Sequence, residues 1–285
     1  MAVRKRWMVL ICASLFVFGG HAHGRQLDVT TSILPVADWA RNVGKDRVNV
    51  SCVLSGGSSP HTFTPSPFDV KRLASADLFI MVGIGLEEWA ESFVSAAGKR
   101  ELTILKLGEK LGFQQGDNPH VWLDPYLAQK MVQKIAEAFS RLDPDSRDFY
   151  DGNARVYIRE IQALHARFTP QFAAIKGKKV VQFHPAFTYM LRRYSIGVLD
   201  SIEQHPGKEP TSKHLQNIIV KLRKETKRVV IIEPQLSSTA AAMVAREASA
   251  TLVVADPLGD TTFPARSTYL ALMEFNLNAL LENLR

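Results

Sequence analysis

Short apolar runs alternate with segments of helical periodicity along two stretches of the chain. In the first stretch the apolar runs lie at 27–31, 48–54, 77–83 and 102–107, and the helical segments lie at 35–43, 67–76 and 87–97. The second stretch has apolar runs at 179–183, 197–203, 228–233 and 250–256, and helical segments at 186–194, 212–226, 238–248 and 267–284. Strands this apolar, separated by helices, are typical of parallel sheets covered on both faces. The pattern therefore predicts an α/β protein with two lobes, each a parallel sheet flanked by helices.

The segment between the two series is predicted to be helical and stiff. Apolar residues recur every four positions on one face of a helix over 125–142, at Leu127, Met131, Ile135 and Phe139. A second helix is predicted over 147–168, and no Gly/Ser-rich linker interrupts the connection. The expected organisation is an N-terminal lobe at 25–142, a long rigid linking helix at 143–176 and a C-terminal lobe at 177–285. Two lobes joined in this way are expected to enclose a fixed cleft.

The first 24 residues follow another pattern. Three basic residues, Arg4, Lys5 and Arg6, precede an apolar run at 7–18, and small residues follow up to Gly24. This order is typical of a cleaved secretory signal peptide. An uncleaved membrane anchor is the alternative, but the run is shorter than the roughly 18 to 20 apolar residues that a membrane span needs. Residues 1–24 are therefore expected to direct export and then to be removed.

Composition narrows the chemistry of the remaining chain. Removal of residues 1–24 takes away three basic residues and no acidic ones, so the formal net charge falls from +7 to +4. That balance is mild, and no Lys/Arg stripe is interleaved with aromatic residues, so nucleic-acid binding is not expected. Cys52 is then the one remaining cysteine. An intramolecular disulfide and a cysteine cluster are both excluded, and a metal site would have to use His, Asp and Glu.

Such residues follow the predicted strands. His61 and His120 lie in loops after strands of the first lobe, while His184 and Asp256 directly follow strands of the second. Ligands of open parallel sheets bind beyond the carboxyl ends of the strands, so these four side chains are expected to meet at the cleft. Imidazole and carboxylate together suit zinc, manganese or iron. Each residue also has a proline beside it, which restricts the backbone and lowers the entropy lost on ordering. We therefore predict a metal site at His61, His120, His184 and Asp256.

Other polar residues are weaker candidates. His165 is expected on the surface or in the packing of the linking helix, and His214 in the solvent-exposed first turn of a helix. Three strand-end residues keep more than one interpretation: His205 could reach the cleft mouth, and Glu203 and Glu233 could hydrogen-bond to the histidine ligands. A helix cap or an interlobe hydrogen bond is an equal alternative for Glu233. The chain has no P-loop, no G-x-S-x-G elbow and no H-E-x-x-H motif.

Longer motifs identify a family resemblance. The stretches at 57–89, 118–128, 183–194 and 231–259 together resemble the metal-specific solute-binding proteins of ABC importers, the cluster A-I type that takes up zinc or manganese. The resemblance covers essentially the whole chain after the signal segment, in the same order. It implies two α/β lobes bridged by a long rigid helix, with a metal ion buried between them.

The same resemblance assigns ligands by motif. It implies four ligands, namely His61 of "SPHTF", His120 of "NPHVW", His184 of "FHPAF" and Asp256 of "ADPLG". In this family a histidine at the third position is typical of zinc-type members and a glutamate of manganese-type members, so His184 favours zinc. Many zinc-type members carry a long His/Asp/Glu-rich loop before the second ligand, whereas "GFQQGDNPH" is short. Manganese and iron therefore stay open as alternatives.

The function implied is capture rather than catalysis. The chain is expected to be a periplasmic, monomeric binding component that delivers a divalent metal, zinc first, to the membrane permease of an ABC transporter. The main rival is a secreted metallohydrolase, which would keep three protein ligands, an open position for water and a nearby general base. Glu203 or Glu233 would have to be that base, and neither lies in a recognisable catalytic motif. A metal-binding surface adhesin would differ in its partner rather than in its site.

Overall fold

Two parallel sheets form the centre of the molecule. The computed structural model describes residues 25–54, 56–204 and 207–285, so the predicted signal peptide at 1–24 and His205 lie outside the described residues. The first sheet has the order β2-β1-β3-β4 and the second the order β6-β5-β7-β8, with every pair parallel. The first sheet is built of β1 (Leu27–Thr31), β2 (Val48–Cys52), β3 (Leu78–Met81) and β4 (Thr103–Lys106). The second is built of β5 (Lys179–Gln182), β6 (Gly197–Ser201), β7 (Val229–Ile232) and β8 (Thr251–Val254).

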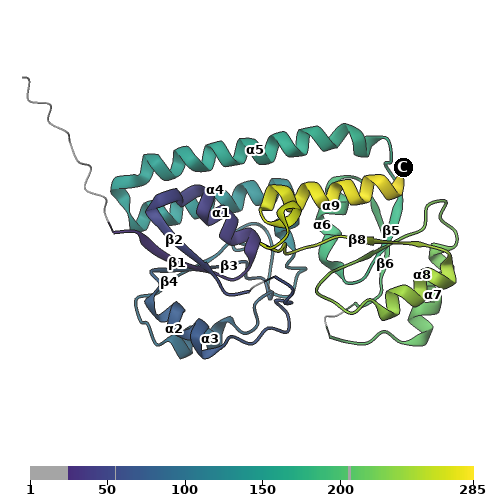
Figure 1. Ribbon diagram of the computed structural model, residues 1–285, viewed down its shortest axis with the longest axis horizontal. Coiled ribbons are helices and arrows are strands. Elements are labelled where there is room, and N and C mark those ends of the chain that lie inside the picture. Colours follow the sequence, from purple (N-terminus) through teal and green to yellow (C-terminus); the bar gives the residue numbers. More distant parts are fainter. Residues whose placement is uncertain (1–24, 55, 205–206) are drawn as a thin grey trace, which may run out of the picture.

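Helices cover both faces of each sheet, which confirms the predicted two-lobed α/β fold (Figure 1). In the first lobe α1 (Leu34–Gly44) lies on one side of the sheet, and α2 (Pro67–Ser75) and α3 (Ala90–Ala97) lie on the other. In the second lobe α6 (Thr188–Arg193) and α9 (Tyr269–Leu284) lie opposite α7 (Ser212–Leu222) and α8 (Thr239–Ala248). Helices cover the sheets because both faces of the central strands carry apolar side chains, whose burial is favourable.

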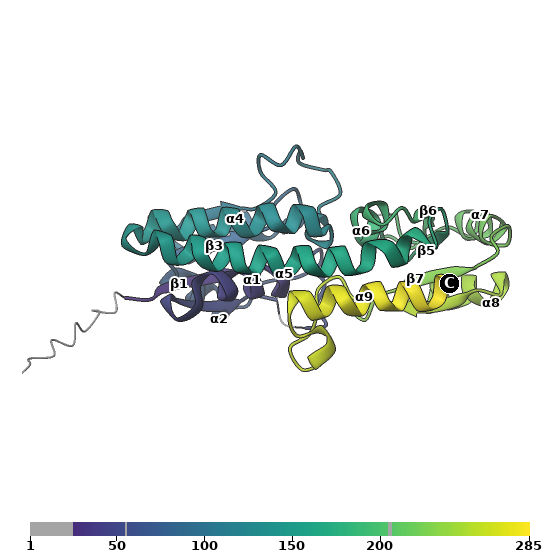
Figure 2. The ribbon, with the colours of Figure 1, turned by 90° about the horizontal axis from the view of Figure 1, so that it is seen from above.

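Two long helices connect the lobes. α4 (Pro125–Leu142) and α5 (Arg147–Ala173) are antiparallel neighbours, and α5 runs along both lobes with α9 beside it (Figure 2). With 27 residues, α5 is about 40 Å long at 1.5 Å per residue. A helix of that length, packed along both lobes, resists bending between them. Within the described residues, no helix has an apolar stretch long enough to cross a membrane.

Three helix ends differ from the sequence prediction by three residues or more. α7 was predicted to extend to residue 226 but ends at Leu222. α5 was predicted to end at residue 168 but continues through Pro170 to Ala173. The proline removes one hydrogen bond of the helix ladder, yet Phe172 extends the apolar face by one more turn and is buried. α3 begins at Ala90 rather than at Glu87, because the Glu87 carboxylate instead accepts hydrogen bonds from the backbone N–H groups of Val82 and Gly83.

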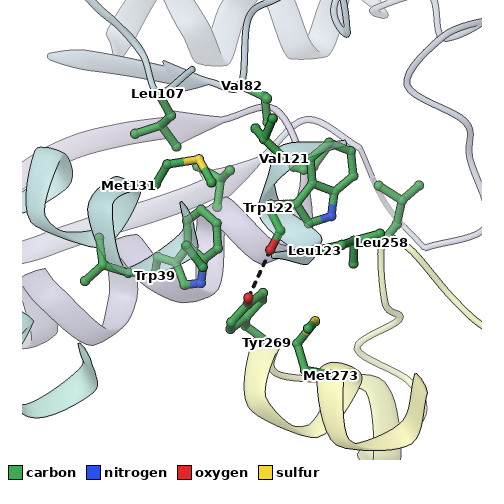
Figure 3. Packing of buried hydrophobic residues seen from close by; sticks show 14 of the residues in the cluster. Trp39, Val82, Leu107, Val121, Trp122, Leu123, Met131, Leu258, Tyr269 and Met273 are labelled. Atoms are coloured by element: carbon green, nitrogen blue, oxygen red, sulfur yellow. Dashed lines mark hydrogen bonds between the residues drawn. The ribbon is translucent and has the colours of Figure 1, made fainter. Parts of the chain in front are cut away.

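Buried aromatic residues join the two lobes next to the strand ends. The turn Val121–Leu123 inserts into the core, where the Trp122 indole lies near Leu258 (Figure 3). Trp122 Nε1 donates to the Pro257 carbonyl at 2.7 Å, and the Tyr269 hydroxyl donates to the Trp122 carbonyl at 2.9 Å. These bonds connect the loop after β4 to the loop after β8. The two halves of the cleft are therefore held together by buried hydrogen bonds.

An ion pair adds a second connection. Arg193 of α6 donates from Nε and Nη2 to the carboxylate of Asp124, at 2.8 to 3.1 Å. Asp124 is also the N-cap of α4, since its Oδ1 accepts from the backbone N–H of Tyr126. One buried carboxylate thus begins a helix of the first lobe and binds an arginine of the second.

Candidate metal centre

Three of the four predicted site residues come together where the loops after β2, β4 and β5 meet. One nitrogen from each of His61, His120 and His184 lies within 4.8 Å of the other two. His61 comes from the loop between β2 and α2, and Trp89 Nε1 fixes that loop by donating to the Pro60 carbonyl at 3.0 Å. His120 precedes the turn at Val121–Leu123, and His184 lies two residues beyond β5. Both lobes therefore contribute to one cluster.

An asparagine orients the ring of His120. Asn118 Nδ2 donates to the Pro185 carbonyl at 2.7 Å, which fixes the amide so that Oδ1 faces His120. This oxygen accepts from the backbone N–H of His120 at 3.0 Å and from its ring Nδ1 at 2.8 Å. Because an amide oxygen can only accept, the proton of the neutral ring lies on Nδ1. The Nε2 of His120 therefore carries no proton, and its lone pair is available to bind a metal ion.

A glutamate orients His184 in the same manner. The Glu233 carboxylate lies 2.5 Å from His184 Nδ1, and the side chains of the two residues are 1% and 5% exposed. Burial raises the pKa of Glu233, while the hydrogen bond from His184 acts in the opposite direction. A carboxylate on the far ring nitrogen makes the imidazole a stronger metal ligand and aims its Nε2. Of the two interpretations of Glu233, the structure thus supports the histidine partner.

The three Nε2 atoms have the spacing of a coordination site. His120 Nε2 lies 3.2 Å from His61 Nε2 and 3.1 Å from His184 Nε2. Nitrogens bound tetrahedrally at about 2.0–2.1 Å from zinc would be separated by about 3.3 Å. Lone pairs this close repel each other unless a proton or a cation lies between them. The arrangement therefore fits one small ion bound to three imidazoles.

Burial keeps two of these imidazoles neutral. The pKa of His61 is lowered to about 4, first by burial and second by the charge of His184. The pKa of His120 is lowered well below its ordinary value by burial and by both neighbouring histidines. Imidazole must be neutral to bind a metal, so these rings are ready ligands near neutral pH.

The space between the histidines is very small. Its volume is about 10 Å³, and its walls include the three rings together with Trp122, Glu233 and Gln235. This is near the smallest cavity volume that can hold one water molecule. The space therefore fits a single small ion.

Asp256, the fourth predicted residue, is not part of this cluster. It follows β8 as expected and is fully buried, but its carboxylate does not line the space between the histidines. Instead Oδ2 accepts from Arg266 Nη1 at 2.6 Å, and Oδ1 accepts from Gln235 Nε2 at 2.7 Å. Gln235 does line the space, so the carboxylate is one hydrogen-bonded residue away from it. Its role as a ligand stays a prediction.

The remaining candidates lie elsewhere. His165 Nδ1 pairs with the Tyr194 hydroxyl at 3.0 Å, as expected for a histidine in helix packing. His214 lies in the first turn of α7, as expected, but its ring is partly covered and Nε2 bonds to the Ser201 carbonyl at 2.8 Å rather than facing solvent. Glu203 is buried, and within the described part of the chain no hydrogen bond joins it to the three histidines.

Three residues that contact the predicted site residues were not predicted from the sequence: Asn118, Gln235 and Arg266. Asn118 is two residues from His120, and Gln235 is two residues from Glu233, so proximity to predicted site residues was an available signal for both. Arg266 lies ten residues beyond Asp256, in a segment without strand or helix pattern. Only the folded chain reveals that it contacts the carboxylate.

Comparison with known proteins places the chain in a family. The family model described as zinc-uptake complex component A, periplasmic, matches residues 29–283. A zinc-binding lipoprotein, AdcA, of Streptococcus pneumoniae is 28% identical over 276 residues, which cover 90% of this chain and 55% of the relative. The high-affinity zinc uptake system protein ZnuA of Bacillus subtilis is 25% identical, over 92% of this chain and 88% of the relative. The chain thus spans about half the length of the first relative and most of the second.

A solved structure agrees in fold. The crystal structure of a zinc-bound ZnuA mutant that lacks residues 138–173 superposes with a TM-score of 0.77 at 26% identity, covering 90% of this chain and 96% of that one. The family match extends over nearly all of the described residues, including β2 to β8, most of β1 and the three clustered histidines. The chain therefore belongs to the family of zinc-uptake complex component A proteins.

Proposed function

We propose that the chain captures a divalent transition-metal ion between its lobes, zinc in preference to manganese or iron, and delivers it to the membrane permease of an ABC importer. The observation that carries this proposal is the convergence of three Nε2 atoms at spacings of 3.1 and 3.2 Å. His120 and His184 each have the other ring nitrogen bound to a fixed partner. Family membership supports the assignment, because this family is described as a zinc-uptake component.

The proposed ligands are His61, His120, His184 and Asp256. The three imidazoles supply neutral lone pairs, and the carboxylate supplies the negative charge that a buried dication requires. Asp256 would have to turn toward the space that Gln235 lines, or the ion would have to approach it along that side. The ion is the cargo of this protein, so binding has to be reversible.

Zinc is proposed first because of the ligand type. Imidazole is a borderline-soft ligand that suits zinc, while manganese is found with more carboxylate and water ligands. The spacing of the nitrogens does not separate these ions by itself. Manganese and iron are therefore kept as alternatives, to be decided by competition.

Hydrolysis is the less favoured function. A catalytic zinc needs room for a water molecule and a substrate beside it. The space between the three histidines measures about 10 Å³. Glu233, one of the two candidates for a general base, already accepts a hydrogen bond from His184.

The family description and the N-terminal pattern support a proposal for location and partner. The family is described as periplasmic, and residues 1–24 have the basic, apolar and small-residue order of a cleaved signal peptide. We infer export to the periplasm, action as a monomer, and docking on a permease after loading. No role in nucleic-acid binding is proposed.

Thermal unfolding of the chelator-stripped protein tests the central step. Zinc at about one hundred times its dissociation constant should stabilise the folded state by about 2.7 kcal/mol. For a domain of this size that corresponds to a rise in Tm of roughly 5 to 10 °C. His120→Ala should abolish most of the rise. His214→Ala is the matched control, because its ring lies outside the histidine cluster, beside the Ser201 carbonyl and the Asp200 carboxylate, and it should keep the full shift.

Two outcomes would overturn the proposal. One is a zinc-induced rise in Tm of equal size in the wild type and His120→Ala. The other is the absence of any rise with zinc, manganese and iron in the wild type. Titration with manganese in the presence of zinc then ranks the ions. In the host organism, deletion should lower cellular zinc during zinc-limited growth, and the wild type but not His120→Ala should restore it.

A further inference from the structure

The carboxylate of Asp256 is fully engaged by hydrogen bonds. Its Oδ2 accepts from Arg266 Nη1 at 2.6 Å, and its Oδ1 accepts from Gln235 Nε2 at 2.7 Å. Oδ1 also accepts from the backbone N–H groups of Leu258 and Gly259, both at 2.9 Å. The side chain of Asp256 is 0% exposed and that of Arg266 is 14% exposed. A buried carboxylate is thus neutralised by one arginine that lies close to the surface.

Gln235 connects the ion pair of Asp256 and Arg266 to the metal centre. Gln235 Nε2 must face Asp256, since a carboxylate only accepts hydrogen bonds, and its Oε1 therefore faces away. That oxygen is buried, and among the described residues it has no hydrogen-bond partner. Gln235 lines the space between His61, His120 and His184. The ion pair of Asp256 and Arg266 consequently lies one side chain away from the proposed cargo.

Arg266 contacts two aromatic rings while it is paired with Asp256. Its guanidinium carbon lies 4.6 Å from the ring centre of Phe263 and 5.7 Å from that of Phe275. Guanidinium groups bind aromatic faces favourably. Loss of the carboxylate partner would therefore leave Arg266 with a favourable contact at the surface.

The segment that carries Arg266 is a short loop with fixed ends. The Asp260 N–H donates to the Arg266 carbonyl at 3.1 Å, which closes residues 260–266 into a loop. Before the loop, the Pro257 carbonyl is bound by the Trp122 indole. After it, the Tyr269 N–H donates to the buried Asp38 carboxylate at 3.1 Å. Arg266 can thus move while Pro257 and Tyr269, on either side of the loop, stay in place.

This loop also touches the loop that carries His61. A Cβ added at Gly56 would lie 2.6 Å from the carboxylate carbon of Asp260, so the backbone at Gly56 packs directly against that side chain. Gly56 is five residues before His61. A change in the 260–266 loop would therefore alter the packing of the loop that carries His61, where the two lobes meet at the metal centre.

We propose that Arg266 is the counter-ion of Asp256 in the metal-free protein, and that the arriving dication displaces it. This rests on the proposed function, with Asp256 as the fourth ligand. A guanidinium and a metal ion compete for one carboxylate, and two cations within a few ångströms of each other repel strongly in a buried site. Arg266 thus lowers the affinity for the ion, which favours release of a cargo. Its displacement loosens the 260–266 loop, so the surface of the protein differs between the metal-loaded and the metal-free state.

Zinc affinity of Arg266→Gln tests the proposal, measured by competition with a chromophoric chelator. Removal of the competing cation should tighten zinc binding by about tenfold or more, the size of a neighbouring-charge effect. Arg266→Lys keeps the charge and should stay near the wild type. Arg167→Gln is the matched control: it breaks a surface ion pair with Glu274 and should change nothing. Combined with Asp256→Asn, the substitution Arg266→Gln should lose its effect, because both act on one contact.

Hydrogen exchange of the wild type gives a second readout that needs no variant to fold. The amides of residues 260–266 should exchange faster in the zinc-loaded protein than in the metal-free protein. Unchanged or weaker zinc binding by Arg266→Gln, or equal exchange of the loop in both states, would overturn the role of Arg266. Wild-type protein that still binds zinc in those cases leaves the proposed function intact, whereas failure of the wild type to bind any of the three ions refutes the function itself.

Discussion

Glu233→Gln is the sharpest test of how the second lobe contributes a ligand. Glu233 and His184 form a hydrogen bond of 2.5 Å between side chains that are 1% and 5% exposed. The substitution keeps the size of the side chain and an oxygen that can accept from Nδ1. It removes the negative charge that strengthens His184 as a ligand.

The magnitude follows from the geometry. A hydrogen bond to a charged group contributes about 1.5–3 kcal/mol, and a neutral acceptor retains roughly half of this. The loss is then about 0.8–1.5 kcal/mol, or roughly 4- to 13-fold in the dissociation constant. Attraction between the carboxylate and the dication through the ring adds to this value. Substitution of such partners of metal ligands typically costs 10- to 100-fold, so we expect zinc binding to weaken within that range.

The assay is competition for zinc against a chelator of known affinity, at fixed pH and ionic strength. Glu203→Gln is the matched control, because Glu203 is a buried glutamate that also follows a strand of the same sheet. It should bind zinc like the wild type. Equal affinities for Glu233→Gln, Glu203→Gln and the wild type would refute the reasoning, since the partner of His184 Nδ1 would then have no influence on the ion.

Three further predictions concern pH and the junction between the lobes. The pKa of His61 is about 4 in the folded protein and about 6.5 in the unfolded chain, so the unfolded chain takes up the proton first. The free energy of unfolding of the metal-free protein should therefore fall by up to about 3 kcal/mol as the pH falls from 6.5 to 4. A flat pH profile of urea midpoints would contradict this. Trp122→Phe leaves the Pro257 carbonyl without its indole donor and should cost about 2 kcal/mol in denaturant unfolding, together with weaker zinc binding. Arg193→Gln breaks a partly exposed ion pair with Asp124 and should cost about 1–2 kcal/mol; loss of less than about 0.5 kcal/mol would show that the pair does not hold the lobes.

The fold was largely predictable because its signals are local. Apolar runs and helical spacing gave all eight strands of the described residues and the order of the helices, with errors of a few positions at the ends. The errors have tertiary causes. Glu87 binds the turn after β3 instead of beginning α3, and the burial of Phe172 carries α5 past Pro170.

The candidate site was predictable in part. The carboxyl ends of parallel strands meet at one edge of a sheet, and this rule predicted that His61, His120 and His184 lie close together. The folded chain has them in one cluster. The contacts of Asp256 could not be predicted, because its partner Arg266 lies in a loop whose path depends on anchors at Trp122 and Asp38. Short-range pattern carries no information about such long-range contacts.

The most direct test of the central claim is a crystal structure of the zinc-loaded protein with anomalous diffraction measured at the zinc absorption edge. We expect one dominant peak between the lobes, at about 2.0–2.1 Å from the Nε2 atoms of His61, His120 and His184. A zinc ion bound elsewhere, or one that leaves any of these three nitrogens uncoordinated, would contradict it.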